Sequence, residues 1–167
     1  MKKTGIFVDV SNIFYCVKNN INNRRVDYLE LYEYCEDFGD IQTAIAYGSQ
    51  IDNDSKTNSF KAFLSRSGYI VKYETIVGKK GDDGQLKYRG DQDVKIAIDM
   101  VTIPNLDLVI LVSADGDLAP ALAHLSSRGV DTMVIGQGIS NKLKEAARHW
   151  IEIGEDLLET PTNVETN

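Results

Sequence analysis

The chain has 167 residues, of which 43% are hydrophobic, and a formal net charge of −7. This length fits one domain. No apolar run reaches the roughly 18 residues that a membrane span needs, and the apolar stretch after Lys2-Lys3 is too short for a signal peptide, so we expect a cytoplasmic protein. Cys16 and Cys35 lie in helical apolar patterns and are expected to be buried thiols. With only two histidines beside them, ligands for a structural zinc site are lacking.

Strand-length stretches rich in Ile and Val alternate along the chain with helical patterns. The strands are expected at 5–10, 41–47, 69–77, 106–112 and 130–135, and the helices at about 12–21, 27–37, 55–67, 94–103, 117–128 and 140–148. This alternation predicts an α/β fold with a parallel sheet and helices on both faces. Continuous hydrophobicity over 108–112 indicates a strand buried on both faces. A short edge strand is expected at about 149–153.

Two segments have no regular pattern. Residues 78–92 form a polar, glycine-rich stretch that is longer than a usual connection, which favours a functional or disordered loop. Residues 154–167 are acidic and contain few apolar groups. We therefore expect a single domain over 1–153 and an acidic, loosely ordered tail over 154–167.

Two of the expected strands end in carboxylates. Asp9 follows the first apolar run, and Ser113, Asp115 and Asp117 follow the run at 106–112. In an open parallel sheet the carboxyl ends of the strands lie at one edge, where ligands bind. These acidic strand ends therefore predict a metal or phosphate site at that edge.

Each polar residue in these motifs also has a purely structural interpretation. Ser11 or Asn12 is suited to cap the first helix, and either Asp115 or Asp117 the helix at 117–128, while Gly116 allows a tight turn between them. Asp93 is suited to cap the helix at 94–103. Asp99, six residues later, lies about 240° around that helix and roughly 9 Å further along its axis. It is alternatively a surface partner of Lys95.

Several carboxylates cannot remain ionised close together without help, because like charges raise one another's pKa. A divalent cation removes this conflict, and oxygen-only ligands point to Mg²⁺ or Mn²⁺. Such an ion can activate water and bind a phosphodiester, so no histidine base is required.

With these acidic motifs the chain resembles the NYN domain family, a ribonuclease-like branch of the PIN superfamily. Three motifs carry the resemblance, in the family's order: Asp9-Val-Ser-Asn12, Gly90-Asp-Gln-Asp93-Val-Lys-Ile-Ala-Ile-Asp99 and Val112-Ser-Ala-Asp115-Gly-Asp117-Leu. The segment Arg128-Gly-Val-Asp-Thr-Met-Val-Ile-Gly136 resembles the family's last strand. Together the matches span residues 4–136.

The resemblance implies a PIN-like three-layer α/β/α sandwich with strand order 3-2-1-4-5, and metal-dependent cleavage of RNA. It implies catalytic and metal-ligand roles for Asp9, Asp93, Asp115 and Asp117, and supporting roles for Asn12, Ser113 and Asp99. Ala114 and Leu118 replace the family's usual Gly and Phe, which affects packing more than chemistry. Asp91 lies beside Asp93, so which of the two faces the site stays open.

The acidic net charge does not exclude RNA, because the charge is unevenly distributed. Residues 154–167 hold four acidic residues and no basic one, and five further carboxylates belong to the expected site. Without these two groups the chain has a slight excess of basic residues. RNA, expected to be single-stranded, therefore remains compatible with the composition.

Contacts to the substrate are expected from the loop that precedes Asp93. It contains Lys79, Lys80, Lys87, Tyr88 and Arg89, which are suited to bind phosphates and to stack on a base. A solvated loop is the alternative. Another basic strip is interpreted as a solvent face; it consists of Lys142, Lys144 and Arg148.

The leading hypothesis is a metal-dependent ribonuclease, and the alternative is a non-catalytic RNA-binding or adaptor module that retains the acidic pocket. A phosphoacceptor receiver domain would need paired acids after the first strand and a lysine after the last, where Ile135-Gly-Gln-Gly138 stands. A metal-ion-dependent adhesion site would need a serine where Ile13 stands. The sequence meets neither pattern.

Overall fold

The first strand of the chain lies at the centre of the sheet. The computed structural model describes residues 1–50, 55–76, 79–80, 86–87 and 92–161. Six strands form one parallel sheet in the order β3-β2-β1-β6-β7-β8. These strands are β1 (Lys3–Asp9), β2 (Asp40–Gln50), β3 (Ile70–Thr75), β6 (Leu108–Val112), β7 (Asp131–Gly136) and β8 (His149–Glu152). The predicted order of five strands is confirmed, and β8 is the predicted sixth strand at the edge.

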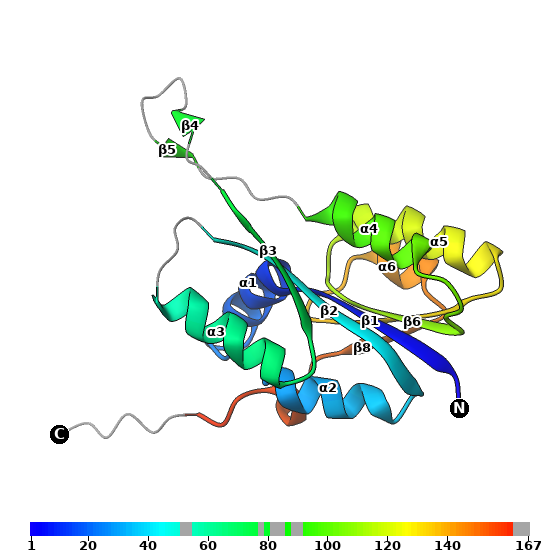
Figure 1. Ribbon diagram of the computed structural model, residues 1–167, viewed down its shortest axis with the longest axis horizontal. Coiled ribbons are helices and arrows are strands. Elements are labelled where there is room, and N and C mark those ends of the chain that lie inside the picture. The colour runs from blue at the N-terminus through cyan, green and yellow to red at the C-terminus, as the bar shows by residue number, and fades with distance from the viewer. Residues whose placement is uncertain (51–54, 77–78, 81–85, 88–91, 162–167) are drawn as a thin grey trace.

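The helices cover both faces of the sheet, so the fold has the predicted three layers (Figure 1). One face is covered by α1 (Val10–Asn20), α2 (Tyr28–Glu36) and α3 (Ser55–Arg66). The other is covered by α4 (Asp93–Thr102), α5 (Ala119–Ser127) and α6 (Asn141–Ala146). The structure also contains two short 3₁₀ helices, η1 (Gly116–Leu118) and η2 (Glu155–Leu157).

The central strands have a hydrophobic core on each side. In β6, Ile110 belongs to the core under α1–α3, and its neighbours Val109 and Leu111 belong to the core under α4–α6. All five residues of β6 are buried, which explains why this segment shows no alternation of polar and apolar residues. The register places Val8 beside Val112 and Asp9 beside Tyr47. The carboxyl ends of β1, β2 and β6 therefore meet at one edge.

The residues after β8 contribute to the first of these cores. Leu157 and Leu158 are buried, and Leu158 forms an isolated β-bridge with Val26. The backbone N–H of Glu159 donates a hydrogen bond to the carbonyl of Arg25 at 2.9 Å. The segment expected to be a tail thus begins by packing against the domain.

The long polar segment before α4 is only partly described. It contains the two-residue strands β4 (Lys79–Lys80) and β5 (Leu86–Lys87), which pair with each other in antiparallel fashion. No strand was expected here, because two residues are too few to give a periodic pattern. Of the predicted substrate-binding residues, Tyr88 and Arg89 lie outside the described residues, as does Asp91. Within the described part of the chain, no helix is long and apolar enough to cross a membrane.

Candidate active site

Three carboxylates meet beyond the carboxyl ends of the strands. Asp93, Asp115 and Asp117 can each offer one oxygen such that all three oxygens lie within 4.8 Å of one another. Asp93 is the first residue of α4, and the other two belong to the turn that follows β6. Asp93 and Asp115 are half-buried and Asp117 is exposed. The cluster is therefore built partly into the protein and is open to solvent on the side of Asp117.

Hydrogen bonds fix the turn that carries Asp115 and Asp117. The backbone N–H of Ser113 donates to the carbonyl of Ile135 at 3.1 Å, and Ser113 Oγ accepts from the N–H of Asp115 at 3.1 Å. Asp115 Oδ1 in turn accepts from the N–H of Asp117 at 3.0 Å. Asp115 is thus the aspartate that caps this turn, although the helix that it caps is η1. The α-helix α5 begins only at Ala119.

Asp9 has a role that the sequence analysis gave to its neighbours. Its Oδ1 accepts a hydrogen bond from the N–H of Asn12 at 3.0 Å, so Asp9 is the residue that caps α1. The expectation that Ser11 or Asn12 caps this helix is wrong. Asp9 is 6% exposed and is not one of the three clustered carboxylates. Its role as a metal ligand therefore stays a prediction.

Asn12 does not cap the helix, and its side chain instead contacts the turn that follows β6. Its Oδ1 accepts a hydrogen bond from the backbone N–H of Ala114 at 2.9 Å and lies 3.7 Å from Cys16 Sγ. Burial raises the pKa of the half-buried Cys16 thiol, and the negative charges of Asp9 and Asp115 raise it further. Cys16 therefore lies within reach of the charges at both acidic strand ends.

Asp93 does not cap α4 as expected. Gln92 occupies the N-cap position without a side-chain capping bond, and its Nε2 donates to Glu74 on β3 at 2.9 Å. Glu74 also forms an ion pair with Lys95. The first turn of α4 is thus joined to the edge strand β3 by two polar contacts, while the carboxylate of Asp93 lies in the cluster.

Asp99 is held by residues of two strands. Its Oδ2 accepts hydrogen bonds from Tyr47 Oη and from Lys72 Nζ, each at 2.6 Å. The suggested surface pair with Lys95 is wrong, because Lys95 pairs with Glu74. Burial tends to raise the pKa of Asp99, but these two hydrogen bonds outweigh it, and the pKa is lower than usual. Asp99 attaches α4 to β2 and β3 and lies outside the cluster.

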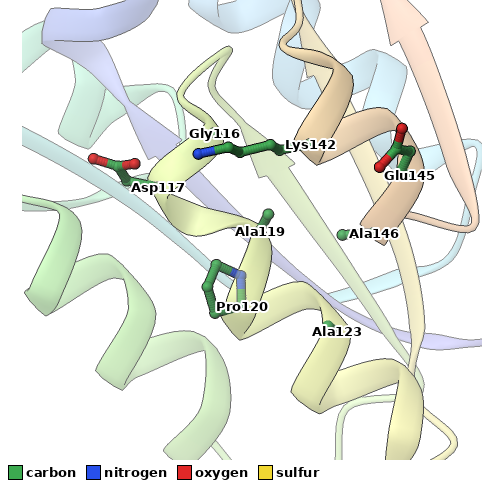
Figure 2. A pocket seen from close by; sticks show the side chains of 8 residues that line it. All are labelled: Gly116, Asp117, Ala119, Pro120, Ala123, Lys142, Glu145 and Ala146. Carbon is green, nitrogen blue, oxygen red and sulfur yellow. The ribbon is translucent and has the colours of Figure 1, made fainter.

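A pocket of about 510 Å³ opens beside Asp117. Figure 2 shows its lining, which is formed by Gly116, Asp117, Ala119, Pro120, Ala123, Lys142, Glu145 and Ala146. The side chain of Lys142 extends over Gly116 toward the side on which Asp117 lies. A Cβ atom at residue 116 would come within 3.3 Å of Lys142 Cδ, so the missing side chain leaves room for the lysine stem.

Lys142, interpreted from the sequence as part of a solvent face, is exposed and also lines this pocket. Its place depends on Ser140, which caps α6 and whose backbone N–H donates to the carbonyl of Ala114 at 3.2 Å. The first turn of α6 is thereby tied to the acidic turn. In the sequence, Ser140 can be identified as a helix cap two residues before Lys142. The contact between Ser140 and Ala114, which places Lys142 beside the acidic turn, cannot be read from the sequence.

The other two residues of that basic strip have structural partners. Lys144 Nζ lies 4.3 Å from the centre of the Trp150 ring and forms an ion pair with Glu152. Arg148 Nε lies 3.4 Å from Asp131 Oδ1. Of the loop cations, the structure describes only the backbone of Lys79, Lys80 and Lys87. Their contact with substrate stays a prediction.

Comparisons with known proteins agree with this architecture. The family model for the NYN domain matches residues 3–154. An uncharacterised protein of Methanocaldococcus jannaschii is 29% identical over 137 residues, which are 79% of this chain and 50% of that protein. The chain thus spans half the length of this curated relative.

A solved structure gives a second comparison. The crystal structure of a protein of unknown function from Vibrio parahaemolyticus matches with a TM-score of 0.84 and 28% sequence identity. The match covers 95% of this chain and 96% of that one. Because the family model covers nearly the whole chain, and the fold and the order of the motifs agree with it, this chain belongs to the NYN domain family of PIN-like nucleases.

Proposed function

We propose that this protein is a metal-dependent ribonuclease that hydrolyses phosphodiester bonds of RNA at the carboxylate cluster. The observation that carries the proposal is the convergence of Asp93, Asp115 and Asp117 within 4.8 Å in a chain of a PIN-like nuclease family. Asp9, buried at the neighbouring strand end, is proposed as the fourth carboxylate. The proposed substrate is single-stranded RNA.

The residues of the cluster fit a hard divalent cation. All three residues offer carboxylate oxygens. Among the described residues, neither His124 nor His149 belongs to the cluster. Oxygen ligands of this kind suit Mg²⁺ or Mn²⁺, which keep several waters while bound to a few carboxylates. A cation would also offset the mutual repulsion of the three negative charges. Asp93, Asp115 and Asp117 are the residues that would hold it.

The protein's own groups would position the reacting phosphate. Hydrogen bonds anchor the turn at 113–117, and Gln92, the residue before Asp93, donates one to Glu74. Both segments that carry the carboxylates are therefore held in place. When bound, the ion supplies Lewis-acid stabilisation of the charge that develops on the phosphate. We assign to Lys142 the binding of a non-bridging phosphate oxygen, because its stem is directed over Gly116 toward Asp117.

The proposal is tested by cleavage of a labelled single-stranded RNA. We expect cleavage by the wild-type chain in Mn²⁺ or Mg²⁺ and none in EDTA. Asp115→Asn should lower the rate at least 100-fold and weaken Mn²⁺ binding measured by calorimetry. Asp37→Asn is the matched control, because Asp37 is an exposed aspartate at the end of α2. RNA binding without cleavage, unaffected by Asp115→Asn, would instead indicate a non-catalytic RNA-binding module.

A further inference from the structure

A second pocket, of about 540 Å³, lies on the face of the sheet that carries α1 and α3. Its walls come from the first turns of α1 and α3, from the ends of β2 and β3, and from the segments around residues 25–28 and 159. Its lining includes the aromatic residues Phe14, Tyr15 and Tyr73 and the charged residues Arg25, Lys56 and Glu159. None of the three clustered carboxylates lines this pocket.

Five aromatic side chains line the pocket. On α1, Phe14 is 39% exposed and Tyr15 is 61% exposed, and their rings meet edge to face with centroids 5.4 Å apart. Tyr73 on β3 and Phe60 on α3 contribute half-buried rings, and Tyr28 contributes a buried one. Single exposed aromatic residues need no explanation, but five rings around one cavity provide faces on which a planar ligand can stack.

The charged groups of the pocket complement a nucleotide. Arg25 and Lys56 are exposed cations that line it, and both are suited to a phosphate. Glu159 also lines it, and its carboxylate can accept hydrogen bonds from the hydroxyl or amino groups of a nucleoside. The backbone hydrogen bond between Glu159 and Arg25 holds these opposite charges on one wall.

The pocket opens next to the carboxyl ends of the strands. Val10 and Ser11, which line it, directly follow Asp9, and Ser49 lies one residue before the end of β2. The pKa of Tyr28 in the pocket is raised mainly by burial, with smaller contributions from the charges of Tyr73 and Asp9. Asp9 therefore lies near the pocket, directly before two of its lining residues.

We propose that this aromatic pocket binds one nucleotide of a single-stranded RNA next to the nucleotide that is cleaved. The base stacks on the exposed ring of Tyr15, which Phe14 supports edge to face, and the phosphate lies near Lys56 and Arg25. A base in a duplex is already stacked and cannot enter such a pocket, so the pocket selects unpaired RNA. This inference rests on the proposed function for the choice of ligand, but it concerns binding and does not require hydrolysis.

The test measures binding of a fluorescein-labelled ten-nucleotide RNA by anisotropy, in EDTA so that no cleavage occurs. Tyr15→Ala removes an exposed ring and Lys56→Glu reverses an exposed charge, so both variants should fold, which thermal melts check. We expect each to bind the RNA about tenfold more weakly than wild type. Trp150→Ala is the control for an exposed aromatic residue on β8, and Arg66→Glu is the control for a cation at the far end of α3. Both controls should bind like wild type.

The outcomes separate this inference from the ribonuclease proposal. Pocket-dependent binding by a chain that never cleaves RNA would support the pocket and overturn the hydrolytic proposal. Cleavage in Mn²⁺ with unchanged binding by both pocket variants would overturn the pocket. The pocket proposal would also be overturned if the wild-type chain did not bind the single-stranded RNA. The same conclusion would follow if the two pocket variants lost as much affinity for a duplex of the same sequence as for the single strand. A change of oligomeric state in Tyr15→Ala, without a change in RNA binding, would assign the pocket to a second copy of the chain instead.

Discussion

Asn12 and Ala114 join the two acidic strand ends. The side-chain oxygen of Asn12 accepts a hydrogen bond from the backbone N–H of Ala114 at 2.9 Å. Asn12 lies in the first turn of α1, which Asp9 caps, and Ala114 immediately precedes Asp115. This bond therefore sets the distance between the end of β1 and the turn that carries the carboxylate cluster.

Asn12→Ala should therefore affect both stability and catalysis. Ala114 is buried, and a buried N–H without a partner costs about 1–3 kcal/mol. We expect a loss of that size in the free energy of unfolding, measured with urea. We also expect at least a tenfold fall in kcat for RNA cleavage, with little change in KM. Asn19→Ala, at an exposed position of the same helix, should change neither quantity, and an equal effect of both variants would refute the link.

Lys142→Ala should lower RNA cleavage without lowering Mn²⁺ affinity. The lysine stem lies over Gly116 beside the cluster, so its loss removes a phosphate contact and leaves the carboxylates in place. We expect a 10- to 100-fold fall in kcat/KM, partly restored by Lys142→Arg. The control is Lys144→Ala, because Lys144 is occupied by Trp150 and Glu152. A wild-type cleavage rate in Lys142→Ala would remove Lys142 from the site.

Tyr47→Phe should destabilise the protein while metal binding persists. Tyr47 is fully buried, and its hydroxyl donates to the carboxylate of Asp99 at 2.6 Å. Hydrogen bonds to charged groups contribute about 1.5–3 kcal/mol, and the value here should lie near the lower limit, because Lys72 still pairs with Asp99. Chemical denaturation measures the loss. A Mn²⁺ affinity that falls as strongly as in Asp115→Asn would show that Asp99 belongs to the metal site itself.

The charge of Asp131 should make stability depend on acid pH. Burial tends to raise its pKa, but the contact with Lys2 at 2.6 Å and the N–H of Thr132 at 3.0 Å outweigh this, so the pKa of the folded state is lowered. A carboxylate of this kind stabilises the fold above its unfolded-state pKa of about 3.9. That contribution is lost as the pH falls through the lower pKa of the folded state.

Asp131→Asn tests this dependence. Wild type should be more stable than the variant at pH 5 and above, and the difference in unfolding free energy should shrink steadily below about pH 4. Asp37→Asn, at an exposed helix end, should show no such trend. A difference between wild type and Asp131→Asn that stays constant from pH 5 to pH 2.5 would contradict the lowered pKa.

The order of the strands was predictable because the resemblance to the NYN domain family implied it. The run at 108–112 could be assigned to the centre of the sheet, since only a strand covered on both faces lacks alternation. The two-residue strands β4 and β5 were not predictable, because so short a segment carries no period. The meeting of Asp93, Asp115 and Asp117 agreed with the motifs, but their proximity was visible only in the structure.

The assignment of helix caps was less successful for a physical reason. Any of Asp9, Ser11 and Asn12 has the chemistry of a cap, and the choice depends on which of them finds another partner. Asn12 finds one in Ala114, which is 102 residues away in the sequence. The surface pair expected for Asp99 failed for a similar reason, because its actual partner Tyr47 is 52 residues away in the sequence. Contacts over such separations leave no local signal.

The central place of β1 has a consequence for protein synthesis. This strand is synthesised before the other strands of the sheet, yet one of its two neighbours is β6, at residues 108–112, and the aspartates of the acidic turn follow β6 directly. A nascent chain that ends before Asp117 lacks part of the carboxylate cluster. The cluster is therefore complete only after most of the domain has been translated, and the proposed cleavage of RNA cannot begin before that point.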